Sequence, residues 1–460
     1  MNKQTRIERI AEVVKRDEAN PYGKIEIPWK GVLKSMPVYQ IPLEYLVFNK
    51  YNGRILSRTK SLESQGQQID AESPEGEALI AKLLLDSNKG RNAQTETSIK
   101  TLGQEKPGII TRDGIIIDGN RRAMLLRKSG KSKYFKTVVL DVALEEDPLE
   151  IEQLETTYQM GEDQKLDYNP IEKYLKAKGL NQRGISVADI ALWMGQPESK
   201  VKEYLEVMAV MDDYLDYLGY NGIYTQLDER EDPFINLTKW TKTFYGGDSQ
   251  KAFDGYRDGD VDDLKTISFD YIRARFEGKR FRILADGLKT NHFFGDKDIW
   301  TNFRDAHFKN TQAIKDAESK IDFNADSLEI YLRERDRSFE MAITPILTDN
   351  IETYEKQLGY KKSANEPLKL VNDATSALDA IDQKHKASSA QDVITKIAKL
   401  NEKTFEILKA KSPAAVLTRV VEILSSLDPS SHEGSKEELL EQVKEIEHLA
   451  YKLEKEVKQL

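Results

Sequence analysis

The chain of 460 residues contains no cysteine. A disulfide framework, a thiolate metal site and a cysteine nucleophile are therefore all excluded. Histidine is scarce as well, and the five histidines show no ligand spacing such as HxxxH, so we expect no structural metal site. No apolar run approaches the ~18 residues of a membrane span, and the N-terminal stretch lacks the apolar core of a secretory signal. We expect a cytoplasmic protein that does not enter the membrane.

An excess of positive charge is also missing, because the formal net charge is -9. Any contact with nucleic acid must therefore come from a local basic face and not from the overall charge. Charged residues make up 32% of the chain and hydrophobic residues only 39%. This balance is typical of a helix-rich protein with much exposed surface.

The length predicts several domains, since a chain of this size exceeds one compact core. Short β-like runs alternate with helices between about 37 and 165, and nearly all of the chain after about 169 has helical periodicity. The predicted class is an α+β N-terminal domain followed by a mostly α-helical remainder. We expect an N-terminal helix and arm, an α/β domain, a helix-turn-helix domain, a helical middle domain and a helical C-terminal region, with bounds 1–36, 37–165, 166–220, 221–345 and 346–460.

The stretch "GIIIDGNRRAMLLRKSG", residues 114–130, predicts an anion site. Three isoleucines read as a buried strand, Asp118–Asn120 as a tight turn, and the residues from Ala123 onward as the apolar side of a helix. Arg121 and Arg122 then stand at the N-terminus of that helix. Backbone N–H groups at a helix N-terminus together with two arginines suit a phosphate group.

The spacing of Ala191, Gly195 and Val201 in "ISVADIALWMGQPESKVKEYLEVM" favours a helix-turn-helix. A small residue lets two helices cross closely, the glycine takes a left-handed turn, and the later β-branched residue packs the second helix onto the first. Pro197 suits the first turn of the second helix. The alternative is an ordinary pair of antiparallel helices with a glycine C-cap.

The helix-turn-helix predicts a face that binds double-stranded DNA. The second helix is also rich in glutamate, so few of its side chains suit base edges or phosphates. The preceding helix offers lysines to phosphates. The alternative is a hairpin that docks a protein and has no DNA role. The candidate DNA contacts are Gln196, Ser199, Lys200 and Lys202 in the turn and second helix, and Lys173 and Lys176 in the preceding helix.

Two further patterns concern the C-terminal half. The stretch 269–284 interleaves basic residues such as Arg273 with Tyr271 and Phe281, which suits nucleic acid or, more commonly, a solvated helix face. The last helix has apolar residues at alternating steps of four and three, which predicts a coiled-coil homodimer or a seam packed within the chain. Those residues are Leu439, Val443, Ile446, Ala450, Leu453, Val457 and Leu460.

The order of these elements over residues 37–215 resembles the ParB family of chromosome and plasmid partition proteins. The likeness begins at "IPLEYLVFNKYNGRI", continues through Ser98 to Pro107 and the Gly119–Arg122 segment, and ends at the helix-turn-helix. The resemblance implies a pocket for CTP with magnesium, and a dimer that closes on DNA when the nucleotide binds. It implies that Gly119, Arg121 and Arg122 hold phosphates. Ser98, Gly103 and Pro107 would belong to the rest of the nucleotide pocket.

Two departures from the family pattern concern the catalytic candidates. Asn120 stands where the family has a glutamate or histidine, and a neutral amide orients a phosphate but is a poor base. Glu155 matches the glutamate of a later family segment whose asparagine and arginine are missing here, and it is the candidate magnesium ligand. An insertion between Arg54 and Ser98 alters the rim of the pocket. The identity of the nucleotide, CTP, ATP or another, is therefore left open.

Three functions follow from these patterns. The first is a dimeric DNA-binding protein of the ParB type that uses a nucleotide as a conformational switch. The second is an enzyme on the same scaffold, either a nucleoside triphosphate hydrolase of the CTPase or ATPase type, a phosphotransferase or a nuclease, in phage defence or DNA modification. The third is an adaptor that recruits a partner ATPase or nuclease through its C-terminal helices.

Overall fold

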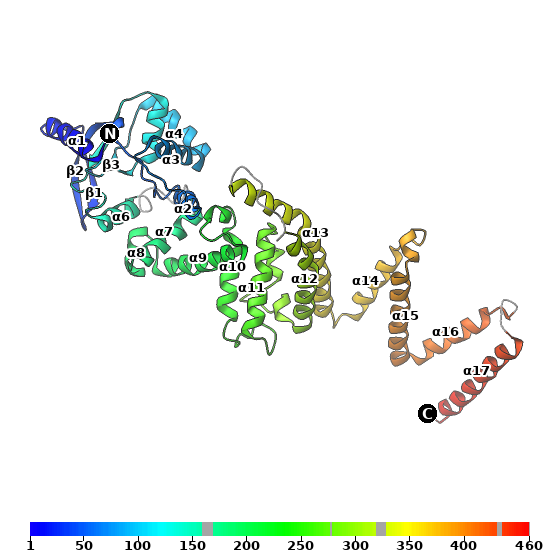
Figure 1. The fold of residues 1–460 in the computed structure, drawn as a ribbon. Helices are drawn as coiled ribbons and strands as arrows, with labels where there is room; N and C mark the ends of the chain where they lie inside the picture. Colours follow the sequence, from blue (N-terminus) through cyan, green and yellow to red (C-terminus); the bar gives the residue numbers. More distant parts are fainter. Residues whose placement is uncertain (159–168, 277, 319–327, 430–434, 460) are drawn as a thin grey trace. The chain divides into compact units, whose positions relative to one another are not determined.

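The computed structural model describes residues 1–158, 169–276, 278–318, 328–429 and 435–459 (Figure 1). The chain divides into two compact units, residues 1–362 and residues 363–460. The first unit contains a small β-sheet and many helices, and the second unit is helical. The predicted class, α+β at the N-terminus with a mostly helical remainder, is confirmed. The five expected domains are finer than these two units and stay a prediction.

Five strands form one mixed sheet in the order β1-β2-β5-β3-β4. Strands β3 and β5 are parallel, and the other neighbouring pairs are antiparallel. The predicted strands at 115–117 and 134–139 thus lie in the same sheet. The strand bounds are Lys24–Trp29 for β1, Val32–Pro42 for β2, Gly108–Ile110 for β3, Ile116–Asp118 for β4 and Tyr134–Val139 for β5.

The isoleucine run before the Gly119 turn is buried on both faces of the sheet. Successive side chains of a strand point to opposite faces. Ile116 packs in one core cluster with Phe135, and Ile117 packs in a second cluster with Ile109 and Val138. Because both faces are covered, the run has no alternating polar residue.

Helices cover both faces of this sheet. Helices α3 and α4, which lie in the insertion or begin there, and α5, which follows the Gly119 turn, pack with α1 on one face, whereas α6 packs on the other. Ser73 begins α3, because its hydroxyl oxygen accepts a hydrogen bond from the backbone N–H of Gly76 and Pro74 occupies the first turn. The helix bounds are Lys3–Asp17 for α1, Pro74–Ser87 for α3, Lys89–Leu102 for α4, Asn120–Ser129 for α5 and Pro148–Thr157 for α6.

The helical remainder of the first unit shares one hydrophobic core, which extends from Leu56 to Leu358. Leu56 begins α2, a helix of the insertion, so this part of the N-terminal sequence packs with the helical region. The last helix of the unit crosses the expected boundary at 345/346 and ends at Lys362. The helix bounds are Leu56–Ser64 for α2, Pro170–Gln182 for α7, Val187–Met194 for α8, Glu198–Leu218 for α9, Glu231–Phe244 for α10, Asp258–Arg273 for α11, Lys297–Glu318 for α12 and Leu328–Lys362 for α13.

Tyr271, Arg273 and Phe281 of the basic and aromatic stretch 269–284 belong to that core, whereas Arg275, Lys279, Arg280 and Arg282 are exposed. Tyr271 and Phe281 are 0% and 1% exposed, so neither ring is available to stack on a base. The Nε of Arg273 donates to a carboxylate oxygen of the buried Asp336 at 2.8 Å. These three residues therefore stabilise the helical core, and the expectation of a solvated helix face is wrong for them.

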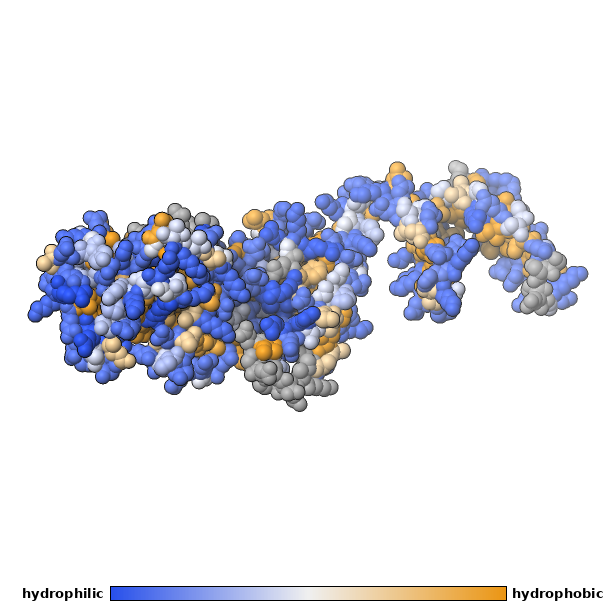
Figure 2. Space-filling view, turned by 90° about the horizontal axis from the view of Figure 1, so that it is seen from above, coloured by the Kyte–Doolittle hydropathy of each residue, from blue (hydrophilic) through white to orange (hydrophobic). Residues whose placement is uncertain are grey.

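The described residues of the second unit form four α-helices and one short 3-10 helix, and none of these helices contains a buried residue. Hydrophobic side chains gather visibly over these helices in Figure 2. In the part of the chain that the structure describes, no helix has the length and apolar character needed to cross a membrane. The helix bounds are Pro367–Asp379 for α14, Gln391–Lys411 for α15, Pro413–Ser426 for α16 and Lys436–Val457 for α17.

Candidate nucleotide site

Two glycines on the ring of Phe135 form the floor of the candidate site. Gly119 has φ +100°, and a β-carbon there would lie 2.7 Å from Cζ of Phe135. A β-carbon on Gly108 would lie 2.4 Å from the same ring and 2.7 Å from the backbone oxygen of Asp118. The structure thus brings the segment after Pro107 next to the Gly119 turn, because the ring of Phe135 fills the space that a side chain would need at either glycine. Gly108 is absent from our predicted site residues, although its place after Pro107 at a strand start was a usable signal.

Arg121 and Arg122 stand in the first turn of α5, as predicted. A helix N-terminus carries partial positive charge, so cations there are unfavourable unless an anion lies between them. Arg122 uses Nη2 to bind the Asp118 carboxylate. Its Nε is buried and has no hydrogen-bond partner among the described residues. Both arginines are half-buried, which limits the water that an incoming anion would displace.

Hydrogen bonds of Asn120 connect the turn at 49–54 to the first turn of α5. Its side-chain nitrogen donates to the backbone oxygen of Ile116 at 2.9 Å, and its side-chain oxygen accepts the backbone N–H of Asn49 at 2.9 Å. Asn120 is 2% exposed. Both polar ends of the amide are engaged, which suits a positioning residue. Its catalytic role stays a prediction.

Glu155 lies on the far side of Asn49 and is 6% exposed. One carboxylate oxygen accepts from the side-chain nitrogen of Asn49 at 3.2 Å, and the other lies 3.3 Å from Nζ of Lys176. Lys176 also pairs with Glu152 at 3.3 Å. These groups line a cavity of about 350 Å³, whose wall includes Tyr51 and Arg183.

This placement bears on the predicted magnesium ion. Both oxygens of Glu155 already contact Asn49 or Lys176. No group of three or more histidine or acidic side chains suited to a metal occurs within the described ranges. Magnesium prefers octahedral oxygen ligands and is commonly held by one or two carboxylates with phosphate oxygens. A magnesium ion here would therefore depend on a bound nucleotide, and Glu155 as its ligand stays a prediction.

Ser98 and Gly103 lie toward the C-terminal end of α4. The hydroxyl of Ser98 donates to Glu105 at 2.9 Å. Gly103 has φ +77° and ends the helix, with its N–H donating to the backbone oxygen of Ile99. Helix α4 is tied to α5 by the ion pair between Glu96 and Lys128 at 3.1 Å. The two predicted residues thus sit on the helix beside α5, and their contact with a base or ribose stays a prediction.

Two helices joined by a short turn lie where the helix-turn-helix is predicted, and the choice between this motif and an ordinary helix pair stays a prediction. Helix α8 ends at Gly195, whose φ is +59°, and α9 starts three residues later. Ala191 and Val201 are buried at 4% and 0%, where the two helices cross. The small residue, the left-handed glycine and the β-branched residue therefore do what their spacing predicted.

The candidate DNA contacts divide by burial. Ser199 and Lys202 are exposed, and Gln196 and Lys173 are half-buried. Lys200 pairs with Glu203 at 2.8 Å, which reduces its charge toward DNA. Lys176 is buried between two carboxylates and cannot reach a phosphate without leaving them. For Lys176 the structure thus shows a role in packing, whereas Ser199 and Lys202 remain the most accessible candidates.

Helix α2 is capped by a carboxylate from helix α7. Its own N-cap residue, Ile55, supplies no side-chain hydrogen bond. Instead the backbone N–H and the hydroxyl of Ser57 donate to the two oxygens of Glu172, at 2.9 Å and 2.6 Å. A carboxylate at a helix N-terminus is favourable. Arg58 joins the same contact by binding Asp228 at 3.2 Å, so α2 is held firmly against the helical region.

Burial raises the pKa of Glu172 to about 7, although the hydrogen bonds from Ser57 oppose this shift. Because the folded-state pKa lies above the unfolded one, its stabilising contribution is complete below about pH 4.5 and is lost as the pH rises through 7. We expect Glu172→Gln to abolish this decrease of stability with rising pH. The free energy of unfolding of the variant relative to wild type should rise by about 2 to 3 kcal/mol between pH 4.5 and 8. Denaturant titrations over that range measure it, and a pH-independent difference would contradict the assignment.

Neither a family model nor a curated protein sequence matches the chain. Among solved structures, C-terminally truncated chromosome-partitioning protein ParB from Caulobacter crescentus, complexed with CTP-gamma-S, is 16% identical, with a TM-score of 0.16. That match covers 44% of this chain and 91% of that chain. A Pnob8-like ParB-N domain is 14% identical, with coverage of 52% and 92% and a TM-score of 0.32. These ParB N-terminal domains are thus similar to about half of the chain at low identity, and the function of the site must be judged from its own residues.

Proposed function

We propose that the protein binds a nucleotide between the glycine floor and the first turn of α5, and that this binding controls how its helix-turn-helix contacts DNA. One observation carries the proposal. A continuous series of contacts runs from Asn120 through Asn49 and Glu155 to Lys176. We call these four residues the asparagine–glutamate chain. It joins the candidate phosphate site on α5 to α7, the helix that precedes the helix-turn-helix.

The phosphate end of the site fits a nucleotide by its chemistry. Arg121 and Arg122 stand in the first turn of α5, and arginine binds phosphate oxygens in a bidentate way. The buried Nε of Arg122 is a donor whose partner a phosphate oxygen would supply. CTP and ATP, each with magnesium, are the proposed ligands. A bound triphosphate would also compete with Asp118 for Arg122, which links ligand binding to the end of β4.

The DNA end of the proposal rests on exposed groups at the start of α9. Ser199 and Lys202 lie on the surface there. Lys173 lies on α7, the helix that precedes α8, and is half-buried. A lysine that neutralises a phosphate makes DNA binding weaken as salt rises. The proposed DNA is double-stranded, and the proposed functional form is a homodimer.

A ligand panel tests the nucleotide part. We expect CTP or ATP with magnesium to raise the thermal midpoint of the protein, because a ligand that binds only the folded state stabilises it. The double variant Arg121→Ala with Arg122→Ala should bind that nucleotide at least about 30-fold more weakly, because charge-assisted hydrogen bonds to phosphate are lost. Thermal unfolding with CTP, ATP, GTP and UTP measures the midpoint, and isothermal calorimetry with the same nucleotides measures the affinity.

Arg112→Ala is the matched control. Arg112 lies on the hairpin between β3 and β4, pairs with the carboxylate of Glu146, and is more exposed than Arg122. The nucleotide affinity of this variant should equal that of wild type. If no nucleotide shifts the midpoint of wild type, or if the paired arginine variant binds as tightly as wild type, the phosphate site is refuted.

Two other functions share this scaffold. A nucleoside triphosphatase, phosphotransferase or nuclease would show turnover of nucleotide or DNA, which the switch alone does not require. Glu155 is buried and its carboxylate is paired with Lys176, which does not favour a role as a catalytic base. An adaptor for a partner ATPase or nuclease would show neither turnover nor a DNA effect, and a partner would co-purify through the second unit.

A further inference from the structure

The segment between α11 and α12 exposes positive charge only. Within the described part of residues 274–292, the single acidic residue is Asp286, which is half-buried and accepts the backbone N–H of Leu288 at 2.8 Å. The whole chain has a net charge of -9, so this segment is a local basic face of the kind that a contact with nucleic acid requires. The exposed charged residues of the segment are Arg275, Lys279, Arg280, Arg282 and Lys289.

Most of this positive charge is not neutralised within the protein. Arg280 pairs with Glu352 at 2.9 Å and lies 3.8 Å from a carboxylate oxygen of Glu355. The other four cations form no ion pair with any residue that the structure describes. On α9, by contrast, Lys200 is paired with Glu203 at 2.8 Å. We call the four cations the α11–α12 basic surface, which consists of Arg275, Lys279, Arg282 and Lys289.

Aromatic rings anchor this segment to the helical core. The rings of Phe281 and Trp240 stack with their centroids 5.0 Å apart, and the ring of Phe276 meets that of Tyr271 edge-on at 5.3 Å. The basic residues next to Phe276 and Phe281 are exposed. A backbone that is already held in place loses little conformational entropy when a ligand binds. The aromatic residues that interrupt the basic ones in the sequence therefore position the cations, and they do not stack on bases.

The segment runs against α10, which in turn contacts α9. A β-carbon on Gly287 would lie 2.9 Å from Oγ1 of Thr243 on α10. Lys239 is exposed one turn before Thr243 and therefore stands on the same face of α10. Lys242 of α10 pairs with Glu206 of α9 at 2.6 Å. Helix α10 thus connects the segment to the second helix of the predicted helix-turn-helix.

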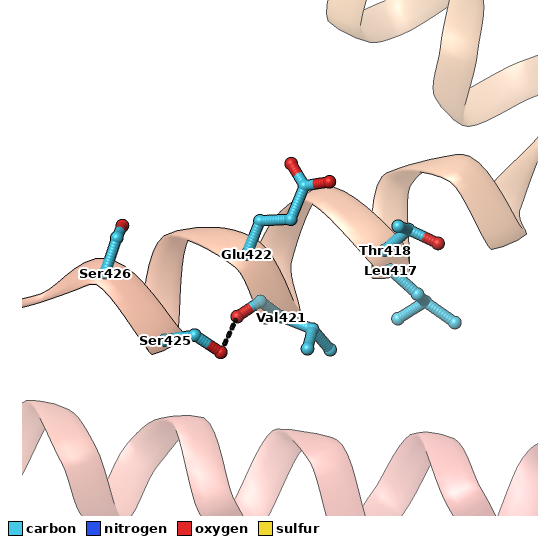
Figure 3. Close-up of a pocket in the computed structure, with 6 residues that line it drawn as sticks. All are labelled: Leu417, Thr418, Val421, Glu422, Ser425 and Ser426. Carbon is cyan, nitrogen blue, oxygen red and sulfur yellow. Dashed lines mark hydrogen bonds between the residues drawn. The ribbon is translucent and has the colours of Figure 1, made fainter.

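The groove on α16 in the second unit has a different chemistry. Leu417 and Val421 point from α16 into this shallow groove of about 660 Å³ (Figure 3). Glu422 supplies the charge in its lining and pairs with Arg419 at 2.9 Å. A carboxylate at the wall of an apolar groove disfavours a phosphate group. We therefore expect no DNA in this groove, and exposed cations of the second unit provide controls.

We propose that the α11–α12 basic surface binds the phosphates of double-stranded DNA at a site outside the helix-turn-helix. This inference rests on the DNA binding proposed above and adds a second surface to it. Arginine binds phosphate oxygens in a bidentate way, and lysine adds a point charge. Contacts to phosphates carry no sequence information, so the α11–α12 basic surface strengthens binding to any duplex.

The salt dependence of DNA affinity in the full-length protein tests the second surface. The triple variant Arg275→Gln, Lys279→Gln and Arg282→Gln should make the slope of log affinity against log salt concentration shallower by about two to three units, because up to three phosphate contacts are lost. Two duplexes of equal length and different base sequence should lose affinity by the same factor. Lys289→Gln alone should make the slope shallower by about one unit, which tests the surface even if the triple variant does not fold.

A charge-matched control comes from the second unit. The triple variant Lys399→Gln, Lys409→Gln and Arg419→Gln removes the same charge from exposed positions and should keep the wild-type slope. Thermal unfolding verifies that each variant keeps the wild-type midpoint.

Comparison with Lys202→Ala on α9 separates this inference from the proposed function. A wild-type slope for the variants of the α11–α12 basic surface, with a shallower slope for Lys202→Ala, would overturn the second surface and leave the helix-turn-helix contact. The reverse pattern would support the second surface and overturn the helix-turn-helix contact. An equal loss of slope in the control triple variant would show that the effect is one of overall charge, which would also overturn the second surface. A wild-type protein that binds no duplex would overturn both.

Discussion

Replacing Gly119 with alanine is expected to lower the free energy of unfolding by about 2 to 5 kcal/mol and to weaken nucleotide binding. The left-handed φ of +100° accounts for about 1 to 2 kcal/mol. The added β-carbon, 2.7 Å from the buried ring of Phe135, adds about 1 to 3 kcal/mol by overpacking. Denaturant unfolding and calorimetry with CTP and ATP measure the two effects.

Gly130→Ala is the matched control, since Gly130 ends the same helix with φ +63° and open space around its α-carbon. It should cost only about 1 to 2 kcal/mol and leave nucleotide affinity unchanged. Equal losses for the two variants would mean that the Phe135 floor does not constrain the site.

Replacing Lys176 with methionine is expected to cost about 3 to 4 kcal/mol at pH 7. The change keeps the apolar stem but leaves Glu155 buried without its cation, and an uncompensated buried charge is strongly destabilising. Thermal and denaturant unfolding measure the loss. Lys173→Met is the control from the same helix, and its half-buried side chain should cost less than about 1 kcal/mol.

The same variant separates packing from DNA binding. The logarithm of DNA affinity is plotted against the logarithm of salt concentration. Lys202→Ala should make the slope of this plot shallower by about one unit, because one phosphate contact is lost. Lys176→Met should leave the slope unchanged. A shallower slope for Lys176→Met together with full stability would restore Lys176 as a DNA contact and remove it from the asparagine–glutamate chain.

Local patterns were enough to predict the turns at Gly119 and Gly195 and the buried isoleucine strand. Gly119 and Gly195 are left-handed in the structure, where the sequence placed a tight turn and a helix-turn-helix. The isoleucine run was identified as a buried strand because only a strand covered on both faces tolerates such a run. These features depend on backbone stereochemistry and on neighbours a few residues away.

Pairings between distant residues were not predictable. Nothing near Lys176 in the sequence shows that Glu152 and Glu155 enclose it, so a lysine on a helix read as a phosphate contact. Arg273 was likewise read as a surface charge, whereas Asp336, 63 residues away, binds it in the core. The Asn120 contact with Asn49 spans 71 residues. Whether a charged side chain meets solvent or a buried partner depends on contacts that residue type alone does not encode.

The sequence by itself determined the turns at Gly119 and Gly195, the buried strand of the isoleucine run, and the position of two arginines at the start of α5, whereas the strand Lys24–Trp29 was missed because the sequence read there as an arm. Those properties follow from φ preferences and apolar periodicity, which act over a few residues. Only the tertiary structure decided that Phe135 supports both Gly108 and Gly119, that Glu172 caps α2, and that Glu155 and Lys176 join the site to α7. The physical reason is that burial sets the energy of a charge or a close contact, and burial exists only once distant segments have packed together.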